Sequence, residues 1–75
     1  MSGLGDRVSA LLGERYGGNV NRAARYMSLP QRTLARIASG ATSNPHADVV
    51  ERIAAHFFVS TTWLLSGAGE RRRYG

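Results

Sequence analysis

Residues 19–40 read NVNRAARYMSLPQRTLARIASG, and this stretch decides how the rest of the chain is interpreted. Apolar residues recur at helical spacing on both sides of residues 28–30, Ser-Leu-Pro. Proline disfavours helical geometry at the residue before it, so the stretch predicts two short helices joined by about three residues. Pro30 is expected at the first position of the second helix, where its missing N–H costs nothing, and Gly40 is expected to end that helix.

Two short helices joined by a tight turn, the second led by polar side chains, form a helix-turn-helix arrangement. Such a pair needs small residues where the helices cross, and Ala23 and Ala24 supply them. It also needs apolar residues in the turn and on the second helix, which are Leu29, Leu34 and Ile37. The N-terminal end of the second helix is then exposed and can enter the roughly 12 Å wide major groove of DNA. The residues exposed there are expected to be Gln31, Arg32, Thr33 and Arg36. Gln can pair bidentately with adenine and Arg with guanine.

The remaining apolar pattern is also helical, and no stretch alternates apolar and polar residues over the length of a strand. Further helices are predicted over residues 4–16, from Asn44-Pro45 to Phe57, and from the cap residue Ser60 to Gly67. The sequence therefore predicts a compact all-α domain of five helices over residues 1–67, followed by a basic, flexible tail over 68–75.

The positive charge is unevenly distributed along the chain. The ten basic residues are all Arg, and with five acidic residues they give a formal net charge of +5. Residues 15–47 contain five Arg and no acidic residue, whereas residues 48–70 contain three acidic residues against one Arg. An acid-free basic block inside a foldable domain is typical of a surface that binds a polyanion, although it also fits an ordinary solvated surface. Its coincidence with the helix-turn-helix stretch favours DNA. Asp48 and Arg52 are expected to pair one turn apart on an exposed helix face.

Several classes of function lack support in the sequence. Cysteine is absent, which removes disulfides, Cys-based zinc sites and thiol nucleophiles. His46 and His56 have no partners at metal-ligand spacing, and no Ser/His/Asp grouping has supporting context. No apolar run approaches the roughly 18 residues of a membrane span, and the N-terminus lacks the pattern of a signal peptide. We therefore expect a cytoplasmic protein that is not an enzyme, with no cofactor, metal, membrane or small-molecule substrate.

Over residues 4–67 the chain resembles the lambda-repressor and Cro-like helix-turn-helix family. The resemblance rests on residues 19–24 (NVNRAA), 27–34 (MSLPQRTL) and 37–40 (IASG), and residues 59–67 (VSTTWLLSG) are similar to the family's last helix. It implies a compact five-helix domain that binds a pseudo-palindromic operator on double-stranded DNA as a homodimer. It also implies transcription regulation of the kind found in phage or prophage switches, as a Cro-like protein or a repressor.

The resemblance also implies roles for individual residues. The recognition helix 30–39 would lie in the major groove, with base contacts from Gln31, Arg32 and Arg36. Phosphate contacts would come from Asn19, Thr33, Ser39, Thr42, Ser43 and Asn44. Val20 stands where the family often has Gln, so we expect Val20 to pack against the core. Ser28 stands where the family often has Gly, which tolerates the positive φ of the turn.

The segment after Phe57 is more apolar than one short helix corner requires. Phe57 and one of the two leucines 64 and 65 are expected in the core, whereas Phe58 and Trp63 are candidate dimer contacts, because exposed apolar patches often mark partner surfaces.

Two other functions stay open. The first is a protein-interaction module on a helix-turn-helix scaffold, such as an antirepressor or an antitoxin-type partner binder. The second, less favoured, is a small RNA binder, which would need exposed aromatic residues for base stacking. Tyr16 and Tyr26 are instead expected to take part in packing.

Overall fold

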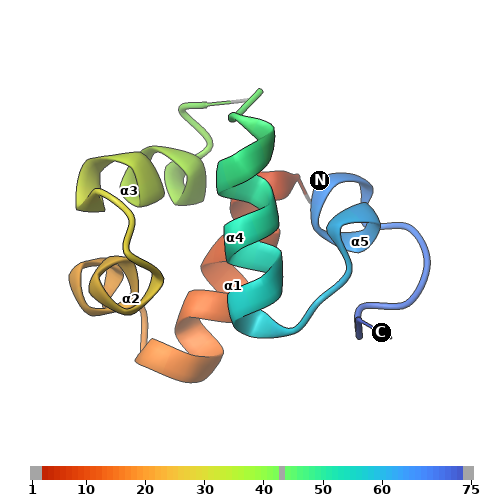
Figure 1. The fold of residues 1–75 in the computed structure, drawn as a ribbon, viewed down its shortest axis with the longest axis horizontal. Coiled ribbons are helices and arrows are strands. Elements are labelled where there is room, and N and C mark those ends of the chain that lie inside the picture. Colours follow the sequence, from red (N-terminus) through yellow and green to blue (C-terminus); the bar gives the residue numbers. More distant parts are fainter. Residues whose placement is uncertain (1–2, 43, 74–75) are drawn as a thin grey trace.

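The computed structural model describes residues 3–42 and 44–73, which fold into five helices (Figure 1). These are α1 (Leu4–Tyr16), α2 (Val20–Met27), α3 (Gln31–Ser39), α4 (Ala47–Phe57) and α5 (Thr61–Ser66). Within the described ranges the extended pairing is an isolated antiparallel bridge between Val59 and Arg72. The predicted all-α, five-helix class is confirmed. None of the helices in these ranges is long and apolar enough to cross a membrane.

Most helix ends follow the predicted local signals. The side-chain oxygen of Asn19 accepts a hydrogen bond from the backbone N–H of Arg22 at 3.0 Å and caps α2. Ser60 caps α5 in the same way, because its hydroxyl accepts from the backbone N–H of Trp63 at 3.0 Å. Gly40 ends α3 with φ 83°, a left-handed conformation that glycine adopts without steric cost.

Two helices begin later than the sequence predicts. Pro30 has ψ 134° and is the N-cap of α3 rather than its first residue, and its carbonyl accepts from the N–H of Leu34 at 3.2 Å. Helix α4 begins at Ala47, two residues after Pro45, because His46 is its N-cap. The His46 ring Nδ1 accepts from the N–H of Asp48 at 3.3 Å.

The core lies at the centre of the helices and draws residues from all five. Its largest fully buried side chains are Leu11, Leu12, Leu34, Ile37, Ile53, Leu64 and Val8. Ala23 and Ala24 are also buried, as the helix crossing requires, and Val20 packs against the core as expected. Leu64 is buried whereas Leu65 is 53% exposed, which confirms that one of the two leucines belongs to the core.

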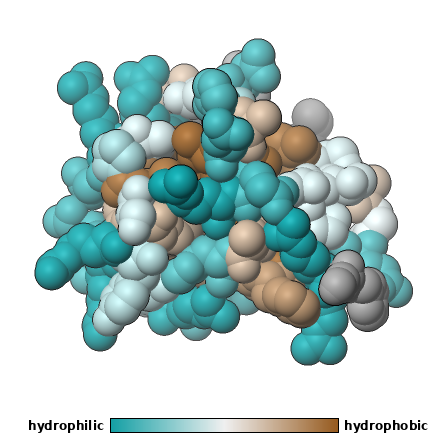
Figure 2. All heavy atoms as spheres, in the orientation of Figure 1, coloured by the Kyte–Doolittle hydropathy of each residue, from teal (hydrophilic) through white to brown (hydrophobic). Residues whose placement is uncertain are grey.

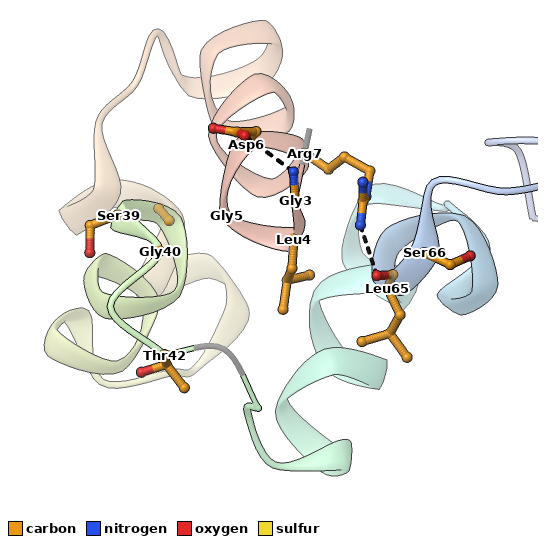
Figure 3. A pocket seen from close by; sticks show the side chains of 11 residues that line it. Gly3, Leu4, Gly5, Asp6, Arg7, Ser39, Gly40, Thr42, Leu65 and Ser66 are labelled. Carbon is orange, nitrogen blue, oxygen red and sulfur yellow. Dashed lines mark hydrogen bonds between the residues drawn. The ribbon is translucent and has the colours of Figure 1, made fainter. Parts of the chain in front are cut away.

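Helix α1 approaches the C-terminal end of α3 closely. A Cβ added at Gly5 would lie 2.8 Å from the Ile37 carbonyl oxygen and 3.0 Å from the Gly40 nitrogen. Figure 3 shows Gly5 of α1 facing the end of α3 at Gly40. The Ser9 hydroxyl also donates to the Ala38 carbonyl at 2.9 Å. Helix α1 thus fixes the position of α3 at its C-terminal end.

Arginine side chains connect the helices by donating to carbonyls at helix C-termini. Arg7, only 7% exposed, donates from Nε to the Leu64 carbonyl and from Nη2 to the Leu65 carbonyl, both at 2.8 Å (Figure 3 draws the second bond). Arg15 donates to the His56 carbonyl at 3.0 Å. Because the last carbonyls of a helix lack partners within it, cations stabilise these ends. Arg52 donates in the same way to the Ser28 carbonyl at the end of α2. Carbonyls at the C-termini of three helices therefore accept hydrogen bonds from arginines in other parts of the chain.

Residues 68–73, the described part of the predicted tail, return to the body of the domain. The Ser60 N–H donates to the Arg71 carbonyl at 2.8 Å, and the Arg73 N–H donates to the Phe58 carbonyl at 3.2 Å. The side chain of Arg71 pairs with Glu14 of α1, and that of Arg73 pairs with Glu51 of α4. Hydrogen bonding from Arg71 lowers the pKa of the Glu14 carboxyl. The segment joins α1, α4 and α5.

Candidate nucleic-acid interface

Helix α3 carries the predicted base-reading residues on its outer side. Gln31, Arg32 and Arg36 are exposed, whereas Leu34 and Ile37 are buried beneath them. Arg32 and Arg36 are four residues apart and share one helix face. The helix is thus anchored by its apolar residues and presents amide and guanidinium groups to solvent.

The turn between α2 and α3 is closed by a residue in the left-handed conformation. Ser28 has φ 56° and ψ 40°, as expected for the position where the family often has glycine. This conformation costs a residue with a side chain about 1–2 kcal/mol. Arg52 of α4 donates to the Ser28 carbonyl at 3.1 Å, in place of the expected pair with Asp48. Helix α4 therefore holds the turn that sets the angle between α2 and α3.

The predicted phosphate-contacting residues lie at both ends of the helix-turn-helix. Asn19 is exposed at the start of α2, and its oxygen is engaged in capping, so its NH2 group is the part left to donate. Thr33 and Thr42 line the same hollow of about 150 Å³ between α3 and the start of α4. Asn44 is exposed beyond that hollow, and Ser43 lies outside the described residues.

Ser39 differs from the other predicted phosphate contacts. Its hydroxyl donates to the Arg36 carbonyl at 3.1 Å and accepts from the Ala41 N–H at 3.4 Å. The hydroxyl is thus used within the end of α3, and a phosphate contact from Ser39 would require it to rotate away from the Arg36 carbonyl.

Three of the five acidic side chains pair with residues outside α2 and α3. Glu14 and Glu51 pair with the tail arginines, and Asp48 lies 3.7 Å from the His46 ring nitrogen. In the part of the chain that the structure describes, four exposed arginines of α2 and α3 have no ion-pair partner: Arg22, Arg25, Arg32 and Arg36. Figure 2 shows hydrophilic side chains projecting from the left of the molecule, where Figure 1 places these two helices. Positive charge that no acidic side chain neutralises is therefore concentrated there.

Sequence reasoning missed three features of this surface. The turn is tied to α4 through Arg52, and Arg71 and Arg73 of the tail pair with Glu14 and Glu51. Tyr16 packs against the core as predicted, whereas Tyr26, also predicted to take part in packing, is 63% exposed and stacks on Tyr16. Across residues 3–42 and 44–73, no group of three His, Asp or Glu side chains is placed to hold a metal ion.

Comparison with known proteins identifies the family. The family model described as "Helix-turn-helix" matches residues 14–64, which is more than half of the 75-residue chain. No curated protein and no solved structure matches the chain. The match covers α2, the turn, α3 and α4, the elements that present and hold the exposed arginines. The chain belongs to the lambda-repressor and Cro-like helix-turn-helix family of DNA-binding regulators.

Proposed function

We propose that this chain is a sequence-specific regulator of transcription that reads double-stranded DNA with α3 in the major groove. The observation that carries the proposal is the exposure of Gln31, Arg32 and Arg36 on one helix, combined with the absence of ion-pair partners for these arginines among the described residues. Arginines that are not engaged within the protein are available to guanine and phosphate.

Base contacts are assigned to the N-terminal half of α3. Gln31 matches the donor and acceptor pair of an adenine edge, and Arg32 and Arg36 match the two acceptors of guanine. Each bidentate pair is worth about 1–3 kcal/mol of discrimination against the wrong base.

Phosphate contacts are assigned to the two ends of the helix-turn-helix. Asn19 lies at the N-terminus of α2, where backbone N–H groups and the helix dipole favour an anion. At the other end Thr33 and Ser39 lie on α3, and Thr42, Ser43 and Asn44 follow it in the sequence. The proposed phosphate contacts are Asn19, Thr33, Ser39, Thr42, Ser43 and Asn44. These contacts set the register of α3 and carry no base information of their own.

The chain is proposed to bind a pseudo-palindromic operator as a homodimer, in the manner of a Cro-like or phage-type repressor that acts by occupancy. One such domain, with a longest dimension of 29 Å, covers one half-site. Two copies spaced one helical turn apart, about 34 Å, double the contact with DNA. Phe58 is 57% exposed and is the first candidate dimer contact. Trp63 is the second, although the Arg71 guanidinium lies over its ring at 5.3 Å.

The test is fluorescence anisotropy with a duplex obtained by selection from random DNA and with its scrambled counterpart, across a salt series. Each phosphate that an arginine neutralises releases condensed counterions, so affinity should fall as salt rises, with a log–log slope of about −0.9 for each such contact. The selected duplex should bind more tightly than the scrambled one at every salt concentration. Equal affinity for both duplexes, or a flat response to salt, would contradict the proposal.

A second function is favoured by a different observation. Phe58 and Leu65 leave large apolar side chains exposed, which fits a protein-interaction module such as an antirepressor or antitoxin-type binder. A chain that elutes as a monomer, ignores DNA and binds a protein partner would establish this function in place of the first.

A further inference from the structure

Two adjoining hollows lie on the outer side of α2. One, of about 470 Å³, is lined by Arg22, Arg25 and Tyr26. The other, of about 300 Å³, is lined by Arg15, Tyr16, Arg22 and Tyr26. Because the hollows share Arg22 and Tyr26, these five residues form one continuous surface, here called the α2 basic surface. None of them belongs to the predicted base or phosphate contacts.

The aromatic part of the α2 basic surface is held in place by stacking. The Tyr16 ring lies between Tyr26, at 5.9 Å and 19°, and His56, at 6.0 Å and 14°. The Tyr16 hydroxyl is also 2.5 Å from the His56 Nε2. Burial, with the nearby Arg15, lowers the pKa of the His56 ring. Tyr16 thus packs against one face of the Tyr26 ring, while the Tyr26 side chain stays largely exposed.

The polar groups of the α2 basic surface have few partners within the protein. Arg22 and Arg25 are exposed and form no ion pair in the described ranges, and the Tyr26 hydroxyl has no hydrogen-bond partner there. Arg15 is fixed by its bond to the His56 carbonyl and lies 5.4 Å from the centre of the Phe57 ring. A concave surface with three guanidinium groups and a phenol hydroxyl suits an anion rich in oxygen acceptors.

The position of the α2 basic surface indicates which anion it binds. It continues directly from Asn19 along α2, and α2 lies beside α3 (Figure 1). In helix-turn-helix proteins the recognition helix lies in the major groove and the preceding helix crosses the backbone, so a duplex read by α3 would bring one phosphate strand against the start of α2. The same strand continues past α2, outside the groove.

We propose that the α2 basic surface binds backbone phosphates that flank the half-site, outside the groove that α3 enters. This inference rests on the proposed function and adds to it that full affinity needs DNA beyond the bases that are read. Guanidinium groups bind phosphate bidentately, and the Tyr26 hydroxyl donates to a phosphate oxygen. These contacts raise affinity and its salt dependence and leave base preference unchanged.

The test compares two duplexes that share the selected operator. One ends at the outer edges of the half-sites, and the other extends about ten base pairs further on each side. Ten base pairs span about 34 Å, which exceeds the 29 Å length of the protein. The variants are Arg22→Gln, Arg25→Gln and Tyr26→Phe. The matched control is Arg72→Gln, which removes the same charge from an exposed residue of the tail. Figure 1 shows the C-terminal segment beside α5, on the other side of the molecule from α2.

Wild type should bind the extended duplex more tightly than the short one. On the extended duplex each Gln variant should reduce the magnitude of the log–log salt slope by about 0.9. When salt rises from 50 to 200 mM, the factor by which affinity falls should then be about 3.5 times smaller for the variant than for wild type. Tyr26→Phe should weaken binding to the extended duplex alone, and Arg72→Gln should leave both slopes unchanged. Equal melting temperatures confirm that the variants are folded.

Each contrary result has a separate meaning. If Arg22→Gln and Arg25→Gln behave like Arg72→Gln while wild type keeps its sequence preference, the inference is wrong and the proposed function stands. A different result is that wild type binds polyglutamate and Arg22→Gln does not, while the two proteins show the same salt slope for DNA binding. The surface then binds an acidic protein partner, and the inference is again wrong. A wild type without sequence preference overturns both proposals.

Discussion

Replacing Gly5 with alanine should destabilise the domain at the contact between α1 and α3. The added Cβ would lie 2.8 Å from the Ile37 carbonyl oxygen, 3.0 Å from the Gly40 nitrogen and 3.1 Å from the Gly40 Cα. All three are backbone atoms, so relief requires the C-terminal end of α3 to shift. Overpacking of this kind costs about 1–3 kcal/mol. The better helix propensity of alanine offsets about 1 kcal/mol of that cost.

Gly13→Ala is the matched control, because a Cβ at this position of the same helix meets nothing within 4 Å. This variant should gain up to about 1 kcal/mol from helix propensity alone. Gly5→Ala should therefore be less stable than Gly13→Ala by at least about 1 kcal/mol. In a domain of this size that difference is about 4–8 °C in Tm, measured by circular dichroism. Equal stability of the two variants would refute the close approach of α1 and α3.

Three further predictions concern the arginine cap, the turn and pH. Arg7→Met keeps the aliphatic length of the side chain but removes the donors to the α5 carbonyls. It should lower the free energy of unfolding, measured with urea, by about 3 kcal/mol. A decrease below about 1 kcal/mol would contradict the capping role of Arg7. Ser28→Gly should stabilise the domain by about 0.5–1 kcal/mol, because the relief of left-handed strain exceeds the added chain entropy; a destabilised variant would count against the strain. Burial holds the pKa of His56 below its ordinary value near 6.5, so the unfolded chain binds more protons just below pH 6.5 and stability should fall as the pH is lowered through that window. His56→Gln should flatten this dependence of stability on pH. A His56 pKa of 6.5 or above, measured by NMR, would rule out the predicted fall in stability.

Features set by neighbouring residues were predictable from the sequence. The caps at Asn19 and Ser60 and the glycine stop at Gly40 depend on local backbone chemistry, and the structure confirms all three. The same holds for the exposure of Gln31 and Arg36, which follows from the burial of their apolar neighbours on one helix. The family match confirms the fold class that these signals indicated.

Features set by distant parts of the chain were not predictable from local patterns. The start of α4 was placed too early because Asn44-Pro45 carries a cap signal, whereas the ring of His46 makes the cap. Arg52 was expected to pair locally but reaches a carbonyl 24 residues away. Charge alone does not separate arginines that bind a ligand from those that cap a helix.

The burial of Arg7 was not predicted from the sequence, although the spacing of its apolar neighbours offers a signal for it. Arg7 lies three residues after Leu4 and four before Leu11, so it falls on the apolar face of α1, and its burial follows from that spacing. Its partners at the end of α5 are 57 and 58 residues away and needed the three-dimensional structure.

The central claim is that α3 reads bases while the start of α2 holds the backbone. It is tested most directly by the ratio of affinities for the selected and scrambled duplexes in two variants. Arg32→Ala should lower this ratio by about 5- to 150-fold, which corresponds to the loss of one bidentate base contact. Asn19→Ala should weaken binding to both duplexes alike and leave the ratio unchanged. An unchanged ratio for Arg32→Ala, with a lowered ratio for Asn19→Ala, would contradict the proposed docking of α3.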